Sequence, residues 1–472
     1  MISTRRAPGP KGHLLLGNLP EFRRDILSLF AQAQKEHGDL IRLRLAHTVA
    51  HVLCHPTMAE QALITDTHNI VKYSQVKPSR GLSLLLGKGL IMSSGDLWRR
   101  QRSLINPMFR PRIIEGFAET LLHCADEMVT RLGQEAATHR HVDMSSEATR
   151  TAMQAVLGTM FSASIKDDSD HIADMITVVL RHSFESLKNP LLAPLWWPTT
   201  RNRRFHAAIT ELDRYISDLV QERVALGVRK EDLLGLFLDA TYPDTGERMA
   251  PRQVRDEIAT MLGAGHETTA TALIWALLQL ARRPEITRQI REELAEIVGN
   301  EPLDFSHLRK LRYLQAVVQE TLRLYAPVPV IPRAVIRETT IDGCRLPQGS
   351  MVFVSVYNIH RHEKFWSNPG EFDPDRFLLE RGSQQRHRCA YIPFGAGERF
   401  CIGSNFASVE LQIFLAKVVG AFDVRMTETE PILSEVAVTM RPSKPVFMTL
   451  EKVSTRLATA CLRNVTTIGT GT

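Results

Sequence analysis

The sequence predicts a mainly α protein with a small β-rich part, that is, an α+β fold. The chain has 472 residues, of which 44% are hydrophobic, so it can bury a large core. Apolar residues recur at helical spacing over most of the chain, and the longest such stretch runs from Pro251 to Arg283. Strand-like apolar runs are short in comparison, which limits the sheet to a small part of the fold.

The strand-like runs fall in two places. Ile41 to Leu45 and Val49 to Cys54 lie near the start of the chain, and Met351 to Val356 lies far downstream. We therefore expect the β-rich part mainly at residues 38–75 and 330–356, joined with the helices in a single domain that spans residues 1–453. Residues 454–472 are rich in Thr, Gly and Ala, and a flexible C-terminal tail is expected there.

The stretch from Pro251 to Arg283 predicts one long buried helix. Proline suits the first helical position, and Pro284 ends the run. About 33 residues at about 1.5 Å each give a length of about 50 Å, enough to cross a domain. The centre of the helix, Ala264 to Thr269, reads AGHETT. Glycine costs about 1 kcal/mol against alanine there, and threonine hydroxyls can bend a helix. Such a centre indicates either a packing notch against another helix or a functional groove.

A glycine-rich loop from Phe394 to Gly403 carries Arg399 and Cys401 ahead of a helical pattern at Ser404 to Phe422. Glycines let backbone amides fold closely around a sulfur atom. The arginine and the start of the helix add positive potential, so we expect a lowered thiol pKa and a thiolate. The loop therefore suits a metal ligand or a nucleophile, and the alternative is a structural cysteine in a turn.

Two pairs of side chains lie at helical spacing. Glu320 and Arg323 are three residues apart, and Trp98 and Arg102 are four apart, so each pair shares one helix face. Taken alone, such pairs are most often solvated ion pairs or cation–π pairs at a surface. These two pairs therefore indicate a function only when they are combined with other motifs of the chain.

The cysteine loop carries a family resemblance. Phe394, Gly397, Arg399, Cys401 and Gly403 match the F-x-x-G-x-R-x-C-x-G haem-binding signature, so the chain resembles the cytochrome P-450 superfamily. The resemblance extends over residues 7 to 453 in the expected order. It implies the cytochrome P-450 fold, with the long central helix over the haem, and a haem-thiolate monooxygenase of the soluble bacterial type without a fused reductase.

The resemblance also implies roles for individual residues. Cys401 would be the axial thiolate ligand of the iron in haem b, with dioxygen as co-substrate, and Thr268 and Glu267 would be catalytic because they deliver protons. A structural triad of Glu320, Arg323 and Arg376 would hold the cysteine loop. The residues expected to contact the cofactor, some through its propionates, are Trp98, Arg102, Ala264, Gly265, Arg333, Phe394, Gly395, Arg399, Cys401 and Gly403.

The segments expected to line the substrate pocket are overwhelmingly apolar. This composition favours a lipophilic small molecule of terpenoid, steroid, fatty acid or macrolide type, which would be hydroxylated or epoxidised. The expected pocket residues are Leu86, Ile91, Met92, Met261, Ala264, Val328, Val330 and Ile331.

Electrons would come from separate proteins, a ferredoxin or flavodoxin with an NAD(P)H-dependent reductase. A basic surface would suit an acidic partner, with Arg99, Arg100, Arg110 and Lys417 as candidates. The net charge of +6 is modest, so nucleic acid is not an expected partner. The absence of an apolar run of 18 residues predicts no membrane anchor, and we expect a cytoplasmic monomer.

Three alternatives have to be weighed. His266-Glu267 begins like a zinc-binding H-E-x-x-H motif, but Ala270 stands where the second histidine is needed. A peroxide-driven peroxygenase or isomerase would not need the proton-delivering pair. A non-catalytic haem-binding sensor would need a second protein ligand, for which His266 is the nearby candidate.

Overall fold

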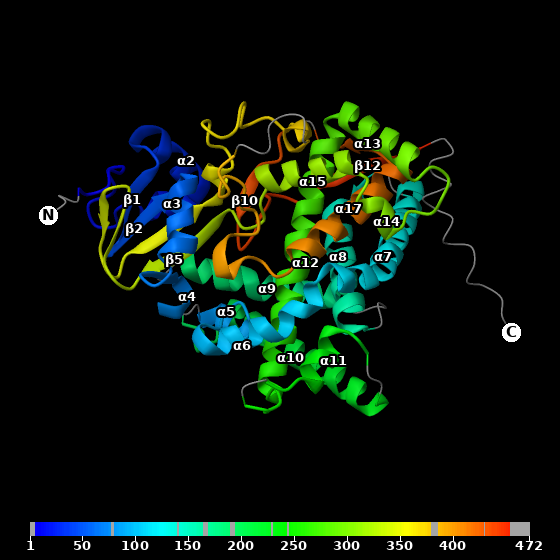
Figure 1. Ribbon diagram of the computed structural model, residues 1–472, viewed down its shortest axis with the longest axis horizontal. Helices are drawn as coiled ribbons and strands as arrows, with labels where there is room; N and C mark the ends of the chain where they lie inside the picture. Colours follow the sequence, from blue (N-terminus) through cyan, green and yellow to red (C-terminus); the bar gives the residue numbers. More distant parts are fainter. Residues whose placement is uncertain are drawn as a thin grey trace.

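The structure, a computed structural model, describes residues 5–76, 80–138, 141–163, 169–188, 194–227, 230–242, 245–378, 386–428 and 430–453. Figure 1 shows the β-rich part at one end, helices filling the rest, and α12 (Pro251–Ala281) running through the middle. The fold is thus mainly α with small sheets, as the sequence predicts. The tail expected at residues 454–472 lies outside the described residues.

Helices form most of the molecule. The other α-helices are α1 (Leu19–Arg24), α2 (Ile26–His37), α3 (Pro56–Glu60), α4 (Tyr73–Val76), α5 (Arg80–Leu86), α6 (Gly95–Ile105), α7 (Pro111–Thr138), α8 (Met144–Phe161), α9 (Ser169–Lys188), α10 (Thr200–Leu226), α11 (Leu233–Asp239), α13 (Pro284–Ile297), α14 (Phe305–Leu308), α15 (Arg312–Leu324), α16 (Val356–Ile359) and α17 (Ser404–Ala421). Short helical turns are η1 (Gln61–Thr65), η2 (Asn106–Phe109), η3 (Pro374–Phe377) and η6 (Gly397–Arg399).

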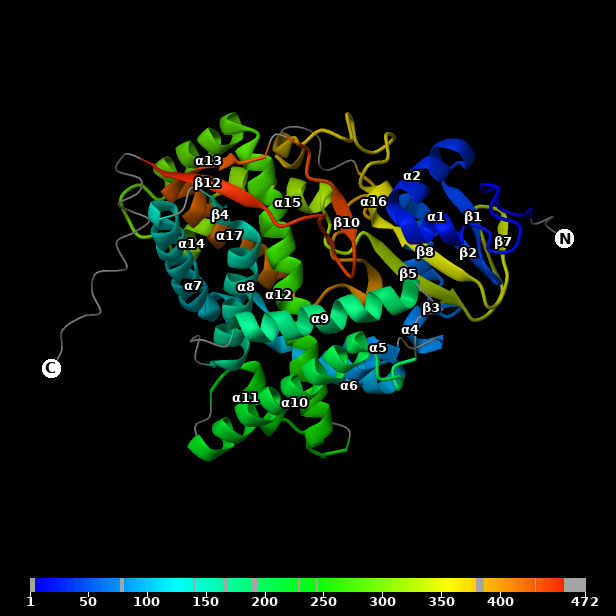
Figure 2. The same ribbon diagram turned by 180° about the vertical axis from the view of Figure 1, so that it is seen from behind.

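The main sheet has five strands in the order β1-β2-β8-β5-β3, namely β1 (Leu40–Leu45), β2 (Thr48–Leu53), β8 (Met351–Ser355), β5 (Val330–Val335) and β3 (Ile70–Lys72). β2 and β8 are parallel, and the other neighbours are antiparallel. The smaller sheets are β4 (Val142–Asp143) with β12 (Phe447–Lys452) and β9 (Phe422–Met426), β6 (Thr339–Ile341) with β7 (Cys344–Leu346), and β10 (Ser434–Val436) with β11 (Met440–Pro442). The view from behind shows β12 and β4 beside α7 and α8, far from the main sheet (Figure 2).

The central helix α12 closely follows the sequence prediction. It begins at Pro251, and α13 begins at Pro284 after a break of two residues. α12 packs against α8, α17, α5 and α15, which buries most of its side chains. A Cβ at Gly265 would come within 2.8 Å of Val156 in α8. Glycine at this position is therefore explained by a close helix crossing, which is the packing notch considered above.

Each face of the main sheet packs against its own apolar cluster, and the side chains of one strand alternate between the two faces. In β8, Val352 and Val354 pack in a core that also holds Ile70 and Ile392, whereas Phe353 packs on the other face. The same alternation decides which face each residue of β5 reaches.

None of the helices within the described ranges is both long enough and apolar enough to cross a membrane.

Candidate active site

The cysteine loop is a tight turn that requires glycine. The Cys401 N–H donates to the Phe394 carbonyl oxygen over 2.9 Å and closes the loop. Gly395 and Gly397 both have a φ of 75°, which side chains disfavour. A Cβ at Gly397 would also overlap the carbonyl oxygen of Leu63. The loop therefore keeps its shape only because these two residues lack a side chain.

Cys401 differs from the other cysteines in its exposure. Cys401 is exposed, whereas the other cysteines in the described part of the chain are buried. Surrounding protein atoms nevertheless desolvate its thiol group, and this burial raises the pKa of the thiol against the lowering effects of the Gly403 backbone and the Arg102 charge. The expectation that the loop itself lowers this pKa is therefore wrong, because desolvation outweighs both. A metal ion at the sulfur would remove the proton.

A cluster of cations lies beside the loop. Burial lowers the pKa of Lys72 to about 7 and the pKa values of Arg333 and Arg399 to about 10. Repulsion by the two arginines adds to the shift of Lys72, and repulsion by Arg399 adds to that of Arg333, whereas Glu398 opposes the shifts of both arginines. The Arg102 charge also acts on Arg399, whose guanidinium lies 3.9 Å from the centre of the Trp98 ring. These side chains are half-buried, and positive charge concentrated in this way is costly unless anions join it. The two propionates of a haem fit this cluster, so the residues present suit the cofactor that the family resemblance implies.

Lys72 is a member of this cluster that the sequence did not single out. β3 pairs with β5 in a register that sets Lys72 opposite Arg333. The Lys72 ammonium also donates to the carbonyl oxygens of Ile91 and Ser93. No local pattern around residue 72 predicts this pairing, because the two strands are about 260 residues apart in the chain.

The centre of α12 carries the residues expected to handle protons. The Thr268 hydroxyl donates to the Ala264 carbonyl oxygen over 2.8 Å, a bond that loosens the helix locally. Glu267 Oε1 accepts a hydrogen bond of 2.8 Å from Thr439, and its buried Oε2 has no partner among the described residues. Glu267 thus has a carboxyl oxygen without a partner among the described residues, and the next residue, Thr268, has a hydroxyl that is bonded only to the preceding turn of its own helix.

The predicted pocket residues come together only in part. Leu86, Met92 and Met261 belong to the large helical core, and Leu86 lies 3.5 Å from where a Cβ of Gly263 would be. Ile331 lies 3.8 Å from the corresponding position of Gly395, which places it beside the cysteine loop.

Two further pocket predictions, Ile91 and Val328, are exposed. The prediction that Val330 lines the pocket is wrong. This residue packs against the core of Phe30 and Phe353 on the far face of the sheet from Ile331. Adjacent residues of a strand point to opposite faces, so Ile331 and Arg333 share one face and Val330 cannot join them.

The triad forms as a buried network. Arg323 donates to both carboxylate oxygens of Glu320, over 2.6 and 2.7 Å, and both side chains are fully buried. Arg376 donates to Glu320 over 3.3 Å. The remaining Arg323 donors bind the carbonyl oxygens of His360, Pro369 and Glu371. Full pairing is what makes charges tolerable at such depth.

His360 connects the triad to the cysteine loop, a role that the sequence did not predict. Its Nε2 accepts the Ile392 N–H over 2.8 Å, so its Nδ1 carries the proton that is donated to the Arg323 carbonyl oxygen over 2.9 Å. Burial lowers the pKa of His360 to about 3, which keeps the ring neutral. Ile392 lies two residues before Phe394, so the triad supports the start of the loop.

The basic surface differs from its prediction at Lys417. This lysine is 1% exposed and bonded to Asp126 over 2.5 Å, so it cannot meet a partner protein. Arg100 lies 6.0 Å from the Tyr242 ring centre and is half-buried. Arg99 and Arg110 are exposed and line a recess of about 350 Å³ along α6 and η2.

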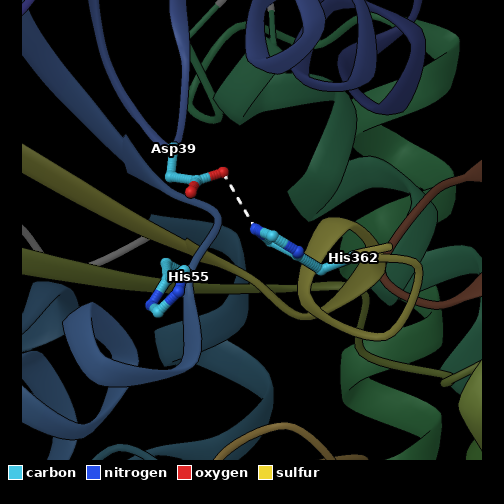
Figure 3. A group of neighbouring side chains, drawn as sticks. All are labelled: Asp39, His55 and His362. Atoms are coloured by element: carbon cyan, nitrogen blue, oxygen red, sulfur yellow. Dashed lines mark hydrogen bonds and ion pairs between the residues drawn. The ribbon is translucent and has the colours of Figure 1, made fainter. Parts of the chain in front are cut away.

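A second group of titratable side chains, Asp39, His55 and His362, joins β1 to the start of α3 and the turn after α16 (Figure 3). Their nearest ligand atoms lie within 4.8 Å of one another, whereas ligand atoms around one tetrahedral Zn²⁺ lie about 3.3 Å apart. His362 Nε2 donates to Asp39 over 3.1 Å, and His55 Nδ1 caps α3 through the Thr57 N–H. These bonds make the group a structural clasp.

Comparison with known proteins agrees with this site. Residues 7–450 match the family described as Cytochrome P-450. The chain is 32% identical over 431 residues to cyclooctatin synthase from Streptomyces melanosporofaciens, covering 89% of this chain and 90% of that protein. It is 30% identical to cyclooctat-9-en-7-ol 5-monooxygenase from the same organism, covering 90% of each, and 27% identical to a cytokinin hydroxylase from Arabidopsis thaliana, covering 94% and 90%. With an exposed cysteine in a glycine-containing loop, a cation cluster beside it and a family match along nearly its whole length, the chain belongs to the cytochrome P-450 family of haem-containing monooxygenases.

Proposed function

We propose that the chain is a haem-thiolate monooxygenase in which Cys401 is the axial ligand of haem b. The observation that carries the proposal is the exposed cysteine on its glycine loop beside a cluster of half-buried cations. A sulfur ligand for iron and counter-charges for two propionates thus occur together. When bound, haem supplies the iron at which dioxygen is reduced and one oxygen atom is passed to the substrate.

Each protein group then has a positioning or proton-handling role. Cys401 would give electron density to the iron, and Lys72, Arg102, Arg333 and Arg399 would hold the propionates. Contacts to the cofactor from Trp98, Ala264, Gly265, Phe394, Gly395 and Gly403 remain part of the proposal. Gly265 would contact the cofactor through its backbone. It has no side chain, and a side chain there would collide with α8.

Protons would pass along α12. Glu267, which is bonded to Thr439, would carry a proton on its free Oε2 toward Thr268. The Thr268 hydroxyl would give up its bond to the Ala264 carbonyl oxygen and turn toward the site of dioxygen reduction. The hydroxyl can do this at low cost, because a back-bond to the preceding turn contributes little to helix stability.

The proposed substrate is a lipophilic small molecule of terpenoid, steroid, fatty acid or macrolide type, hydroxylated or epoxidised by the enzyme. Leu86, Met92 and Met261 supply apolar walls. One relative is named for its action on cyclooctat-9-en-7-ol, a largely hydrocarbon alcohol that suits such walls. Two electrons would come from a ferredoxin or flavodoxin and its NAD(P)H-dependent reductase, docked near Arg99 and Arg110.

The carbon monoxide difference spectrum of the reduced protein tests the ligand. Wild type should give the spectrum of a thiolate ligand, and Cys401→Ala should lose it. Cys389→Ala is the matched control, because Cys389 is buried and should leave the spectrum unchanged. A thiolate spectrum that survives Cys401→Ala would reject the assignment.

The Thr268 role has its own test. Thr268→Ala should still bind haem yet divert electrons to peroxide, and Thr268→Ser, which keeps the hydroxyl, should restore product formation per electron. Full coupling in the alanine variant would contradict proton delivery and favour a peroxide-driven enzyme. The sensor alternative lacks its second ligand, since the buried His266 ring is bonded to the Leu262 carbonyl oxygen over 2.7 Å.

A further inference from the structure

Three consecutive residues in the first turns of α12 hold the end of α5 and the segment Gly87 to Ser93 that follows it. Arg255 donates to the carbonyl oxygens of Leu84 and Leu85 just ahead of the segment. Asp256 accepts the Lys88 N–H over 2.8 Å. Glu257 accepts the Leu90 N–H over 3.0 Å. A set of backbone bonds from one helix to one loop fixes where that loop can lie.

The fit between loop and helix is also steric. A Cβ at Gly87 would overlap the Asp256 carboxylate, and a Cβ at Gly89 would overlap the Thr260 hydroxyl. Gly87 has a φ of 49°. The loop backbone therefore lies directly on the side chains of α12, which is possible only with glycine at both places.

Glu257 is an unusual residue for such a position. It is fully buried, and the Gln253 amide donates to its second oxygen over 2.9 Å. Burial raises the pKa of Glu257 to about 7, against the bonds from Leu90 and Gln253, which lower it. A buried carboxyl of this kind is costly, and the hydrogen bond from the loop offsets part of the cost.

The other end of the segment is tied to the cation cluster. Lys72 donates to the Ile91 and Ser93 carbonyl oxygens, and Arg399 donates to Ser93 over 3.1 Å. The segment thus spans from α12 to the groups that would hold the propionates. Two residues expected to line the pocket, Ile91 and Met92, lie within it, and Leu86 directly precedes it.

We propose that Asp256 and Glu257 are positioning residues that hold Gly87–Ser93 as a wall of the substrate pocket and so restrict which lipophilic molecules enter. The inference rests on the proposed function, because the pocket is part of it. The carboxylates act through the loop backbone and touch no reacting atom. Loosening them should change the binding of bulky ligands while leaving the iron site intact.

The test uses the haem-loaded enzyme and Glu257→Met, which keeps the bulk and removes the acceptor. Hydrogen–deuterium exchange should speed up in Gly87–Ser93 by about tenfold or more, since the buried hydrogen bond that holds the Leu90 N–H is lost. Two probes that bind haem iron directly then report on the pocket. The dissociation constant of imidazole, which is too small to reach the wall, should stay within about twofold, while that of 4-phenylimidazole should change by about fivefold or more.

Two further variants sharpen the result. Glu257→Gln can still accept the Leu90 N–H and should resemble wild type in both measurements. Glu293→Met is the matched control. Glu293 also accepts two backbone N–H bonds, from Tyr313 and Leu314, but it does so between α13 and α15, so neither measurement should move. If Glu257→Met does not fold, Gly89→Ala is the substitute. Its Cβ would collide with Thr260 of α12, so it should push the segment away from the helix and give the same changes in both measurements.

The outcomes separate the two proposals. Unchanged exchange in Gly87–Ser93 would overturn the proposal that Glu257 holds this segment. Faster exchange with an unchanged response to 4-phenylimidazole would overturn the pocket wall. Failure of wild type to bind imidazole would count against the haem function. The exchange measurement would still test whether Glu257 holds the segment.

Discussion

Gly397 shows how strongly a single residue constrains the cysteine loop. Its φ of 75° and the carbonyl oxygen of Leu63 leave no room for a side chain. The sequence motif marks this residue as glycine, but only the structure names Leu63 in η1 as the reason. The loop is therefore shaped by its contact with η1 as well as by its own residues.

Gly397→Ala should lower the free energy of unfolding by about 2 kcal/mol or more, because it combines a left-handed backbone with steric overlap. Haem retention should fall in parallel. Thermal unfolding and haem content measure both. Gly370→Ala is the control, since nothing lies within 4 Å of a Cβ there. Equal effects of the two variants would show that the Leu63 contact is unimportant.

Glu410 is a buried acid that the proposed chemistry does not use. It lies on α17, is fully buried and accepts a 2.8 Å hydrogen bond from Thr269, while its other oxygen has no partner among the described residues. Burial raises the pKa of this carboxyl to about 8, against the bond from Thr269. The folded protein therefore holds a proton here that the unfolded chain releases.

This difference predicts a pH dependence of stability. The unfolded carboxyl ionises near 4.5 and the folded one near 8, so the folded state binds more protons between these values. The free energy of unfolding should fall as pH rises through this window, and no further above it. Glu410→Gln should gain stability over wild type on going from pH 5 to pH 8, by on the order of a few kcal/mol in denaturant titrations. An advantage that stays constant with pH would contradict the shift.

At the scale of elements, α15 and the loop before α17 are joined through His360. The ring bonds the Arg323 carbonyl oxygen on one side and the Ile392 N–H on the other. Since burial lowers the pKa of His360 to about 3, the ring stays neutral and keeps this tautomer around neutral pH. The link therefore behaves as a fixed strut.

His360→Ala should lower the free energy of unfolding by about 2 to 4 kcal/mol, because it leaves a buried N–H unpaired and opens a cavity. The loss should be the same at pH 6 and pH 8. The thiolate-type spectrum should also weaken, since Ile392 leads into the cysteine loop. His68→Ala, at an exposed position, is the control in both measurements. An intact spectrum in a destabilised His360→Ala protein would limit the strut to a purely structural role.

At the scale of the whole molecule, the basic surface along α6 is the docking place proposed above for a redox partner. Arg99 and Arg110 are exposed there, whereas Lys417 is buried in an ion pair with Asp126 and does not contribute to this surface. Exposed charges mainly affect the rate of association and its dependence on salt.

Arg110→Glu should slow reduction by an acidic ferredoxin by about threefold to tenfold at low salt and flatten the salt dependence. Arg288→Glu, an equal charge change on exposed α13, should have little effect. Stopped-flow reduction at several ionic strengths measures both variants. Equal slowing in the two would mean that net charge matters and the α6 surface does not.

The local part of the fold could be read from the sequence with good accuracy. α12, α17 and the strands β1, β2 and β8 lie within one or two residues of their predicted bounds. Each is specified by its own apolar period and by proline or glycine at its ends, so distant residues are not needed to predict it. Sequence spacing likewise brought Glu320 and Arg323 together, because one helical turn sets their distance.

Contacts between distant segments could not be read in this way. Val330 was expected in the pocket and lies on the other face of β5, and Lys417 was expected at the surface and is buried. Lys72 and His360 were missed altogether. Each of these depends on strand register or on which helix crosses which, and a single sequence carries no local signal for either.

The sequence by itself therefore determined the chemistry, because the cysteine, its glycines and its arginine lie within ten consecutive residues and form one motif that can be recognised without knowing their contacts. Only the tertiary structure decided which charges surround the sulfur and what holds the wall beside it. Lys72 meets Arg333, and Glu257 meets Leu90, across separations that chain folding alone can close. Their energies depend on burial, and burial is a property of the packed molecule.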